Sequence, residues 1–233
     1  MRRSIGEKMI LNEQSERYVE IFDRDRDYWN SVYGNKSVIQ APSPFAQELL
    51  SRLEAGKFLV DMGCGNGRDS LFFASHGLRI LGVDASDVAI QTLKEREDAE
   101  RLRFECTDFV TIALPDASVD YCYCRFTLHA INEKQADIML NNVARILKPG
   151  GELFIEARSI YDPLCGKGKP VGENAYVYNG HYRRFLSPKQ VRTELDRSGL
   201  LVVFCEVSDT FAPYQGEKPP VLRVIAKKRN EGR

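Results

Sequence analysis

A glycine-rich turn is the segment that most constrains how this chain can fold. The apolar run Phe58–Leu59–Val60 predicts a buried strand, and Asp61 follows it at the start of a turn with glycine at three alternate positions, Gly63, Gly65 and Gly67. Because glycine has no Cβ atom, these positions can adopt a positive φ and bring bare backbone close to a bulky group. A strand, a tight glycine turn and a helix in succession predict the ligand-binding start of a parallel α/β sheet.

The rest of the chain alternates between strand and helix patterns. Apolar runs predict further strands at residues 79–84, 102–106, 119–124, 153–155, 202–204 and 221–226. Apolar side chains at helical spacing predict a helix over 136–147 that ends at the turn Lys148–Pro149–Gly150–Gly151, and Ser187 is placed to cap a helix that ends at Gly199. This alternation is typical of an α/β fold with a doubly wound, mostly parallel sheet and helices on both faces.

Two stretches do not follow this alternation of strands and helices. Residues 1–56 carry helical patterns broken by Pro42 and Pro44. Residues 159–186 form a connection longer than the roughly 12–15 residues of an ordinary loop, and long loops at the carboxyl ends of parallel strands commonly hold substrates. We therefore expect an N-terminal helical lid or cap at 1–56, and a ligand-binding domain at 57–233 with a substrate-covering insertion at 159–186.

Charged residues around the turn indicate which ligand it binds. Asp84 ends the second predicted strand, about 20 residues after the turn, where an acid accepts hydrogen bonds from a ribose diol. The sixth position of the dinucleotide-binding fingerprint should be glycine but is Arg68 here. Asp61 would repel a diphosphate, whereas it suits an ammonium group. A ligand with an adenosine at one end and an amino acid at the other, which is S-adenosylmethionine (SAM), therefore fits better than NAD.

Four segments resemble, in order, the motifs of the class I SAM-dependent methyltransferases. They are Val60–Ser70, Val83–Ser86, Cys106–Phe109 and Leu147–Gly151. The resemblance covers about residues 57 to 158 and the last strands. It implies a Rossmann-like sheet of seven strands with the last one antiparallel, and SAM as cofactor. In the third segment it implies that Asp108 holds the adenine amino group while Phe109 lies against the ring.

The predicted cofactor-binding residues follow from these segments and the positions beside them. Trp29 and Tyr33 share the apolar face of an N-terminal helix and are placed to close over the cofactor, although core packing explains them nearly as well. The full set is Trp29, Tyr33, Asp61, Gly63, Cys64, Gly65, Asn66, Gly67, Arg68, Asp84, Ala85, Ser86, Asp108, Phe109 and Cys124.

Further resemblances concern the acceptor. The turn, with Asn66–Ser70, is similar to the tellurite-resistance and thiopurine-type branch of the family. The segments Arg125–His129, Glu156–Ser159 and Gly180–Phe185 resemble small methyltransferases of bacterial surface-polysaccharide and sugar modification. This second resemblance implies O-methylation of a small polar or anionic acceptor such as a sugar or sugar derivative. The alternatives are detoxifying S-, N- or tellurite-type methylation, SAM binding without catalysis, and, more remotely, an NAD-dependent dehydrogenase.

A hydroxyl acceptor needs a base to take its proton, and histidine titrates near neutral pH. The predicted catalytic residues are His129, just past the fourth strand, and His181, in the insertion. Alternatively, His129 packs or caps the next helix and His181 is a solvated loop residue. Four arginines at strand ends or in the insertion are predicted either to bind an anionic substrate group or to pair with acids such as Glu156 and Asp162. They are Arg125, Arg158, Arg183 and Arg184.

Composition narrows the possible partners. Lysine plus arginine equals aspartate plus glutamate, 33 each, which argues against a nucleic-acid partner. No apolar run approaches the ~18–20 residues that span a bilayer. The scattered cysteines indicate reduced thiols of a cytoplasmic protein, and Cys122 and Cys124 lack a second Cys/His pair at zinc-site spacing. We expect a small-molecule substrate and no metal, and the oligomeric state is left open.

Overall fold

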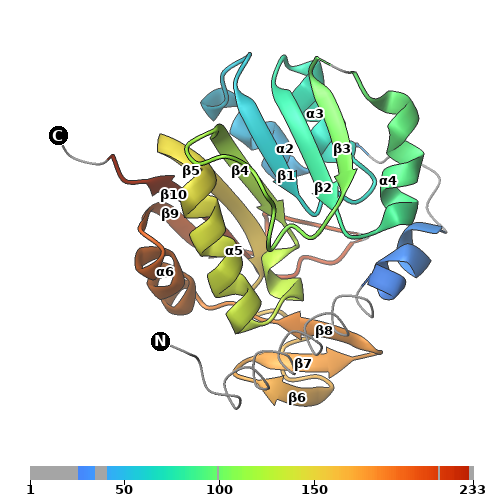
Figure 1. The fold of residues 1–233 in the computed structure, drawn as a ribbon. Coiled ribbons are helices and arrows are strands. Elements are labelled where there is room, and N and C mark those ends of the chain that lie inside the picture. The colour runs from blue at the N-terminus through green and yellow to red at the C-terminus, as the bar shows by residue number, and fades with distance from the viewer. Residues whose placement is uncertain (1–25, 35–40, 99, 215, 231–233) are drawn as a thin grey trace, which may run out of the picture.

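A seven-stranded sheet forms the centre of the protein (Figure 1). The computed structural model describes residues 26–34, 41–98, 100–214 and 216–230. In sheet order, the strands are β3 (Leu102–Cys106), β2 (Arg79–Asp84), β1 (Phe58–Met62), β4 (Val119–Arg125), β5 (Leu147–Arg158), β10 (Val221–Lys228) and β9 (Leu200–Ser208). The first five run parallel, whereas β10 is antiparallel to both of its neighbours. The predicted doubly wound sheet with an antiparallel last strand is therefore confirmed.

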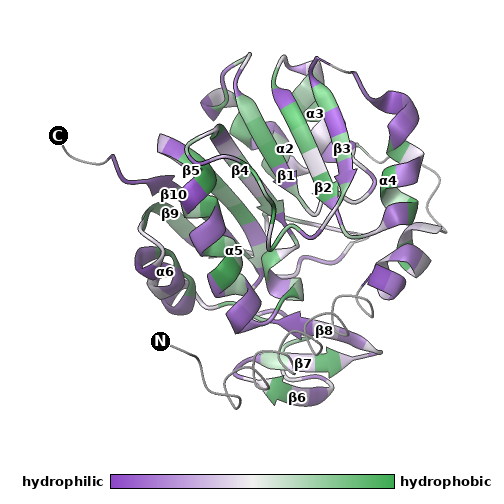
Figure 2. Ribbon diagram, in the orientation of Figure 1, coloured by the Kyte–Doolittle hydropathy of each residue, from purple (hydrophilic) through white to green (hydrophobic). Residues whose placement is uncertain are grey.

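Helices cover both faces of this sheet. One face carries α2 (Pro44–Leu49), α3 (Arg68–Ser75) and α4 (Asp87–Leu93), with the short 3₁₀ helices η1 (Leu50–Arg52) and η2 (Lys94–Arg96). The other carries α5 (Glu133–Ile146), α6 (Pro188–Arg197) and the 3₁₀ helix η3 (Leu128–Ala130). Successive side chains of a strand point to opposite faces, so Leu59 packs with the first group and Val60 with the second. Figure 2 shows the apolar residues along the central strands and the polar residues on the outer side of α6.

Local capping explains where the helices begin. Asn132 and Gln135 close a capping box at the start of α5, in which each side chain accepts a hydrogen bond from the other residue's backbone N–H. Ser86 caps α4 by accepting from the N–H of Ala89, and Ser187 caps α6 in the same way. Each cap satisfies an N–H group that has no partner within its helix. The predicted helix start at Ser187 is confirmed.

The start of β5 differs from the predicted turn. Lys148–Pro149–Gly150–Gly151 lies inside β5, which begins directly after α5 at Leu147. The pairing with β4 shifts register between Val119 and Tyr121, and Gly150 has a φ of +77°. Proline and glycine therefore mark an irregular strand entrance here. The sequence pattern could not distinguish such an entrance from a free turn because both need the same backbone angles.

The insertion has regular structure that the sequence analysis did not predict. It forms a three-stranded antiparallel sheet of β6 (Lys169–Gly172), β7 (Ala175–Tyr178) and β8 (His181–Arg184). Asn179 and Gly180 join β7 to β8, with φ values of +51° and +73°. Asparagine followed by glycine is the residue pair that favours a two-residue hairpin turn with positive φ. This pair was the available signal for the hairpin.

The N-terminal region contributes to two parts of the molecule. Residues 26–34 are helical, whereas α2 packs against the main sheet through the buried residues Phe45, Ala46 and Leu49. The part of the predicted N-terminal helix that carries Tyr18, Ile21 and Phe22 lies outside the described residues. Among the helices that the structure describes, none is both long and apolar enough to cross a membrane.

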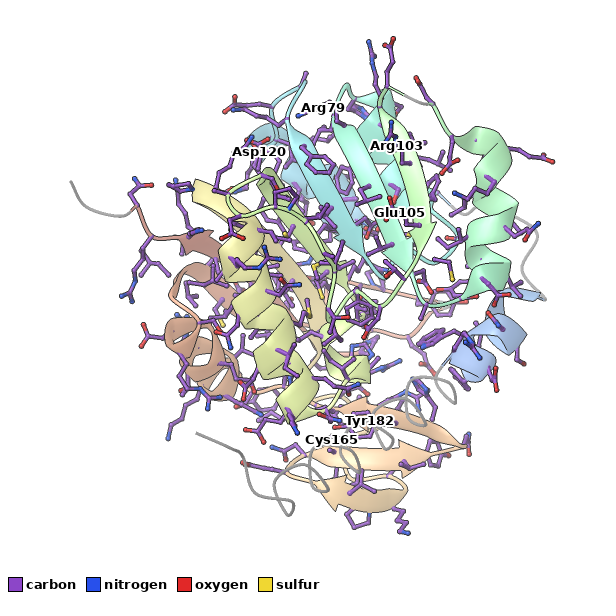
Figure 3. All side chains as sticks on the ribbon, in the orientation of Figure 1. Arg79, Arg103, Glu105, Asp120, Cys165 and Tyr182 are labelled. Carbon is purple, nitrogen blue, oxygen red and sulfur yellow. The ribbon has the colours of Figure 1, made fainter. Side chains whose placement is uncertain are left out.

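The two ends of the sheet have different chemistry. Arg79 and Asp120 lie at the amino ends of β2 and β4, and Tyr182 lies in the insertion sheet at the opposite end (Figure 3). Asp120 accepts hydrogen bonds from Lys148 Nζ at 2.8 Å and from the N–H of Phe58 at 3.0 Å. The amino end is therefore held by an ion pair between neighbouring strands, and the ligand site lies at the carboxyl end.

Candidate active site

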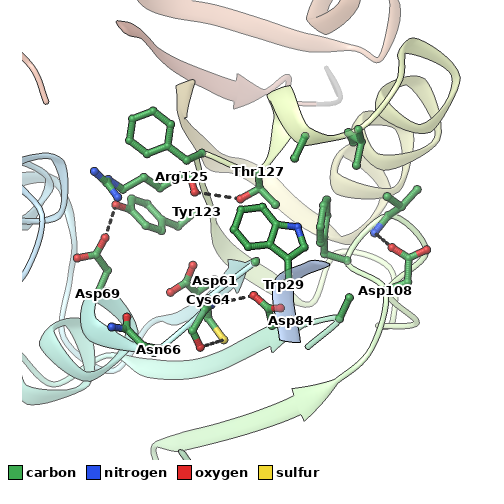
Figure 4. Close-up of a pocket in the computed structure, with 18 of the residues that line it drawn as sticks. Trp29, Asp61, Cys64, Asn66, Asp69, Asp84, Asp108, Tyr123, Arg125 and Thr127 are labelled. Carbon is green, nitrogen blue, oxygen red and sulfur yellow. Dashed lines mark hydrogen bonds between the residues drawn. The ribbon is translucent and has the colours of Figure 1, made fainter. Parts of the chain in front are cut away.

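A cavity of about 220 Å³ opens at the carboxyl ends of β1, β2 and β4 (Figure 4). The strand order reverses between β1 and β4, and such a reversal leaves a crevice in which α/β sheets bind ligands. The helix at 26–34 supplies part of the wall. The predicted cofactor residues that line the cavity are Trp29, Tyr33, Asp61, Gly63, Cys64, Gly65, Asn66, Arg68, Asp84, Ala85, Asp108 and Phe109.

The glycine turn crosses from β1 to the start of α3. Gly63 and Cys64 both donate their N–H to the Val83 carbonyl of β2, at 2.7 and 3.0 Å. Gly63 and Gly65 have φ values of +81° and +53°, a region that residues with a side chain rarely occupy. A Cβ atom at Gly65 would overlap the Tyr33 hydroxyl. The group that packs closely against Gly65 in this structure is therefore Tyr33, on the helix at 26–34.

Two buried carboxylates lie behind the turn. The Asp84 oxygens accept hydrogen bonds from the N–H of Gly65 at 2.8 Å and of Ser86 at 2.9 Å. Burial raises the pKa of Asp84, and these backbone hydrogen bonds act in the opposite direction. Asp61 accepts a hydrogen bond from Ser70 Oγ at 2.6 Å, and burial raises its pKa to about 7. The centre of the cavity is therefore acidic, and Asp61 takes up a proton unless a cation compensates its charge.

The far end of the cavity is formed by Asp108 and Phe109 after β3. Asp108 Oδ1 accepts a hydrogen bond from the N–H of Val110 at 2.9 Å, which sets the direction of the carboxylate. Figure 4 shows the Trp29 indole between this end and the Asp84 carboxylate. The Trp29 and Tyr33 rings stack with their centroids 6.0 Å apart. Aromatic surfaces therefore cover the part of the cavity that is predicted to receive the adenosine.

Three predicted cofactor residues do not line the cavity. Gly67 is the N-cap of α3, where a Cβ atom would lie 2.8 Å from a methyl group of Leu93. Ser86 caps α4 and donates its hydroxyl proton to Asn30 at 2.6 Å. Cys124 is fully buried in the core beneath α5 because alternate residues of β4 face opposite sides of the sheet. These residues shape the elements around the cavity.

Two of the predicted substrate-binding arginines pair with the acids named as their alternative partners. Arg125 Nε lies 2.7 Å from Glu156 Oε1, and Arg158 Nη1 lies 2.6 Å from Asp162 Oδ2. Arg125 also lines the cavity, and both guanidinium groups lie over the ring of Phe126, at 4.6 and 6.0 Å from its centroid. Arg125 therefore forms an ion pair with Glu156 and also lines the cavity.

The other two arginines differ from each other in burial and pairing. Arg184 is buried in an ion pair with Glu194 of α6, with 2.8 Å between Arg184 Nη1 and Glu194 Oε1. This pair attaches the insertion to α6, so the position of Arg184 does not support its predicted contact with substrate. Arg183 donates a long hydrogen bond of 3.4 Å to the Tyr178 carbonyl, and desolvation and then Arg158 lower its pKa. Arg183 is therefore close enough to Arg158 for the two charges to repel each other, while Asp162 and Tyr28 act in the opposite direction.

The two histidines are brought close enough to influence each other, although neither lines the cavity. His129 is buried in η3, and desolvation, followed by Arg158 and His181, lowers its pKa well below the usual value. His181 stacks on Tyr28 with ring centroids 4.2 Å apart and meets Trp29 edge-on at 5.3 Å. Burial, followed by Arg183 and Arg158, lowers the pKa of His181 to about 4. Both imidazoles are therefore neutral near pH 7.

Known proteins with a related sequence decide the family. The family model of a methyltransferase domain matches residues 59–151. A ubiquinone biosynthesis O-methyltransferase from Coxiella burnetii is 29% identical over 205 residues, which cover 82% of this chain and 86% of that protein. An O-methyltransferase from Pyrenophora dematioidea is 30% identical over 59% of this chain and 54% of its own length. The chain is a SAM-dependent methyltransferase with its methyltransferase domain at residues 59–151.

Solved structures agree on the fold of this methyltransferase. A SAM-dependent methyltransferase from Methanosarcina mazei superposes with a TM-score of 0.69 at 18% identity, covering 82% of this chain and 100% of that one. At this identity the likeness concerns the fold alone.

Sequence reasoning missed several residues of the methyltransferase cavity, of which Asp69, Tyr123, Thr127 and Gln135 are polar. Asp69 Oδ2 accepts hydrogen bonds from the hydroxyls of Tyr123 at 2.9 Å and Ser43 at 2.8 Å. Thr127 Oγ1 donates to the Met62 carbonyl at 2.8 Å. Tyr123 and Thr127 lie at the carboxyl end of β4, so their places after the fourth strand were the available signal.

Proposed function

We propose that this methyltransferase transfers the methyl group of SAM to a hydroxyl oxygen of a small acceptor that carries a negative charge. The observation that carries the proposal is the gathering of Arg158, Arg183, His129 and His181 beside the cofactor cavity, where each arginine lowers the pKa of both histidines. An anion placed among these groups would attract the arginines and favour the protonated form of the imidazoles. The O-methyltransferase names of the relatives support oxygen as the acceptor atom.

The residues of the cavity fit SAM chemically. Asp84 accepts backbone hydrogen bonds from Gly65 and Ser86, and because a carboxylate has about four lone-pair sites it can also accept one from a ribose hydroxyl. Burial raises the pKa of Asp61 although Ser70 and Arg125 act in the opposite direction, and the ammonium group of the amino-acid part would add a positive charge beside this carboxylate. By resemblance, Asp108 would accept a hydrogen bond from the adenine amino group, and Phe109 would lie against the adenine ring. We assign Trp29 and Tyr33, on the helix at 26–34, to a lid over the adenosine.

Positioning accounts for most of the proposed catalysis. SAM supplies a methyl carbon bonded to a positively charged sulfur, which takes the electron pair of the breaking C–S bond as the new C–O bond forms. Holding the acceptor oxygen in line with that bond can contribute roughly 7–11 kcal/mol. We assign this orienting role to Arg158 and Arg183, and assign the insertion at 159–186 to covering the acceptor. Trp29 and Tyr33 would exclude water from the adenosine side.

The acceptor proton goes to an imidazole in this mechanism. His181, whose pKa is about 4 in the free enzyme, is a weak base, because burial and then Arg183 and Arg158 disfavour its protonated form. An acceptor anion bound between these arginines and His181 raises that pKa again. The bound acceptor would therefore activate its own base, and acceptors without the charge would react slowly even when they bind.

A second candidate function is methylation of a soft nucleophile such as a thiol. The low basicity of both imidazoles favours it, since a thiol loses its proton with little help from a base. The two candidates differ in how the rate depends on the histidines and on the charge of the acceptor. SAM binding without catalysis, the third reading, predicts no product from any acceptor.

A panel of matched acceptors tests the proposal. Purified enzyme is given radiolabelled SAM and pairs of compounds that differ in one carboxylate, such as a hydroxybenzoate and its phenol or a uronic acid and its neutral sugar, together with thiols. We expect transfer to the hydroxyl of the charged member, with kcat/KM at least about tenfold above its neutral partner. Equal rates within every pair, or transfer to thiols alone, would remove the anionic hydroxyl acceptor from consideration.

A further inference from the structure

A chain of alternating charges, exposed at its Glu48 end and buried at Arg223 and Glu156, reaches the cavity from α2. Glu48 Oε2 lies 2.6 Å from Arg223 Nη1, and Arg223 Nε lies 2.7 Å from Glu156 Oε2. The other oxygen of Glu156 lies 2.7 Å from Arg125 Nε. Arg223 also donates to the Phe211 carbonyl at 2.7 Å and lies between the rings of Phe45 and Phe211. This Glu48–Arg223–Glu156–Arg125 chain is a continuous path of ion pairs, and Arg125 is its member that lines the cavity.

The Glu48–Arg223–Glu156–Arg125 chain of ion pairs restricts the position of the Arg125 side chain. Glu156 is fully buried and each of its oxygens faces one arginine, so it cannot turn without breaking an ion pair. Arg125 is held through Nε on one side and rests on the Phe126 ring on another, at 4.6 Å from the ring centroid. Its terminal nitrogens, Nη1 and Nη2, remain for a ligand in the cavity. A guanidinium group that is fixed before binding loses little entropy when it meets a carboxylate.

The place of Arg125 in the cavity selects the part of the ligand it would meet. Figure 4 shows Arg125 and Tyr123 on the side of Asp69, with Asp61 nearer the middle and Asp108 at the far side. Asp61 is the buried acid assigned above to the ammonium group of SAM. Asp69 repels a carboxylate and already accepts hydrogen bonds from Ser43 and Tyr123. A cation beside these acids suits the carboxylate that accompanies the ammonium group in the amino-acid part of SAM.

The geometry points to Arg125 as the residue that binds the SAM carboxylate, with Glu156 and Arg223 as the positioning residues that hold it in place. This assignment rests on the proposed binding of SAM in the cavity, and it moves Arg125 from its predicted role at the acceptor. Arg158 and Arg183 remain the residues that we propose to bind the negative charge of the acceptor. A positioning role differs from a purely structural one, because it acts on the recognition of one ligand group and not on overall affinity.

Two ligands that differ only in the carboxylate isolate the contribution of that carboxylate to binding. S-Adenosylhomocysteine and its analogue without the carboxylate, 5′-deoxy-5′-(3-aminopropylthio)adenosine, are titrated calorimetrically into the enzyme and its variants. For the wild type we expect the carboxylate to strengthen binding by about 10- to 100-fold, as charged hydrogen bonds do. For Arg125→Met the ratio of the two dissociation constants falls to about 1. For Glu156→Gln and Arg223→Lys, which loosen Arg125 without removing it, the ratio lies between these values.

A matched control separates positioning from loss of fold. Arg184 and Glu194 form a comparably buried pair outside the cavity, at 2.8 Å. Glu194→Gln should lower the thermal midpoint as Glu156→Gln does but leave the ligand ratio at the wild-type value. If Glu156→Gln does not fold, Arg223→Lys and the solvent-accessible Glu48→Gln carry the same comparison.

The possible outcomes are distinct. A wild-type ratio near 1, or a ratio unchanged in Arg125→Met, overturns the assignment, and in the second case an increased KM for the acceptor would return Arg125 to the acceptor side. An unchanged ratio in both Glu156→Gln and Arg223→Lys overturns the positioning role. Failure of the wild type to bind S-adenosylhomocysteine at all would instead contradict the proposed function on which the assignment rests.

Discussion

The imidazole of His181 stacks on the phenol ring of Tyr28, with the ring centroids 4.2 Å apart and the planes inclined by 12°. His181 begins β8 of the insertion, and Tyr28 belongs to the helix at 26–34, whose Trp29 and Tyr33 line the cavity. One ring pair therefore connects the proposed acceptor cover to the proposed cofactor lid. Two segments that are more than half the chain apart in sequence meet at this contact.

The burial of His181 predicts a loss of stability in acid. Its pKa falls from 6.5 to about 4 in the folded protein, so between these values the unfolded chain binds more protons and stability decreases as the pH falls. His181→Phe keeps a ring on Tyr28 without a titrating group. Between pH 6.5 and 4, we expect the free energy of unfolding of this variant to fall by up to about 3 kcal/mol less than that of the wild type. Urea titrations at each pH measure the difference. The exposed His76→Gln variant serves as control, and a wild-type slope in His181→Phe would contradict the linkage.

Removing either imidazole should slow the reaction without weakening cofactor binding. For an acceptor found in the panel, His129→Asn or His181→Asn is expected to lower kcat by about 10²–10⁴-fold for the residue that serves as base. The dissociation constant of S-adenosylhomocysteine should stay within about twofold, since neither histidine lines the cavity. Steady-state kinetics and calorimetry measure the two effects. Normal turnover in both variants together with a pH-independent rate would instead support a soft nucleophile.

Cofactor binding should become tighter as the pH rises towards neutrality. Burial raises the pKa of Asp61 from 3.8 to about 7, so the free enzyme holds a proton there below that pH. The ligand ammonium group favours the carboxylate, and the proton is released on binding. We expect the affinity for S-adenosylhomocysteine to increase by up to about tenfold per unit below pH 7 and then level off. Asp61→Asn should bind weakly with no such slope, and a flat wild-type profile would argue against an ammonium contact.

A methyl group at Gly65 should weaken cofactor binding as well as strain the turn. Gly65 has a φ of +53°, and its Cβ position overlaps the Tyr33 hydroxyl. We expect Gly65→Ala to cost about 1–2 kcal/mol of stability from the backbone and to weaken S-adenosylhomocysteine at least about tenfold. Gly56→Ala is the matched control, because Gly56 has a φ of +81° with nothing within 4 Å of its Cβ position. Equal ligand affinity in the two variants would show that Tyr33 does not constrain the site.

Local signals in the sequence correctly predicted the glycine turn and the start of α6. Positive φ at Gly63 and Gly65 and the cap at Ser187 depend on atoms within a few residues of each other. The same locality explains the errors. Cys124 follows Tyr123 in a strand that ends at the cavity, but alternation turns its side chain into the core, and only the strand's orientation in the sheet decides which residue faces which side. Likewise, Arg183 and Arg184 are adjacent in sequence, yet only Arg184 finds a buried acid.

The local patterns of the sequence were thus enough to predict the doubly wound sheet and the chemistry of the glycine turn, because apolar periodicity and glycine conformation act over short stretches of chain. The antiparallel last strand was implied only by the resemblance to class I SAM-dependent methyltransferases. The tertiary structure alone decided which charges meet. Glu48 and Arg223 are distant in sequence, as are Tyr28 and His181, and each pair is in contact. Ion pairs and ring contacts form between elements that the packing of the two sheet faces brings together, and that packing depends on the whole core.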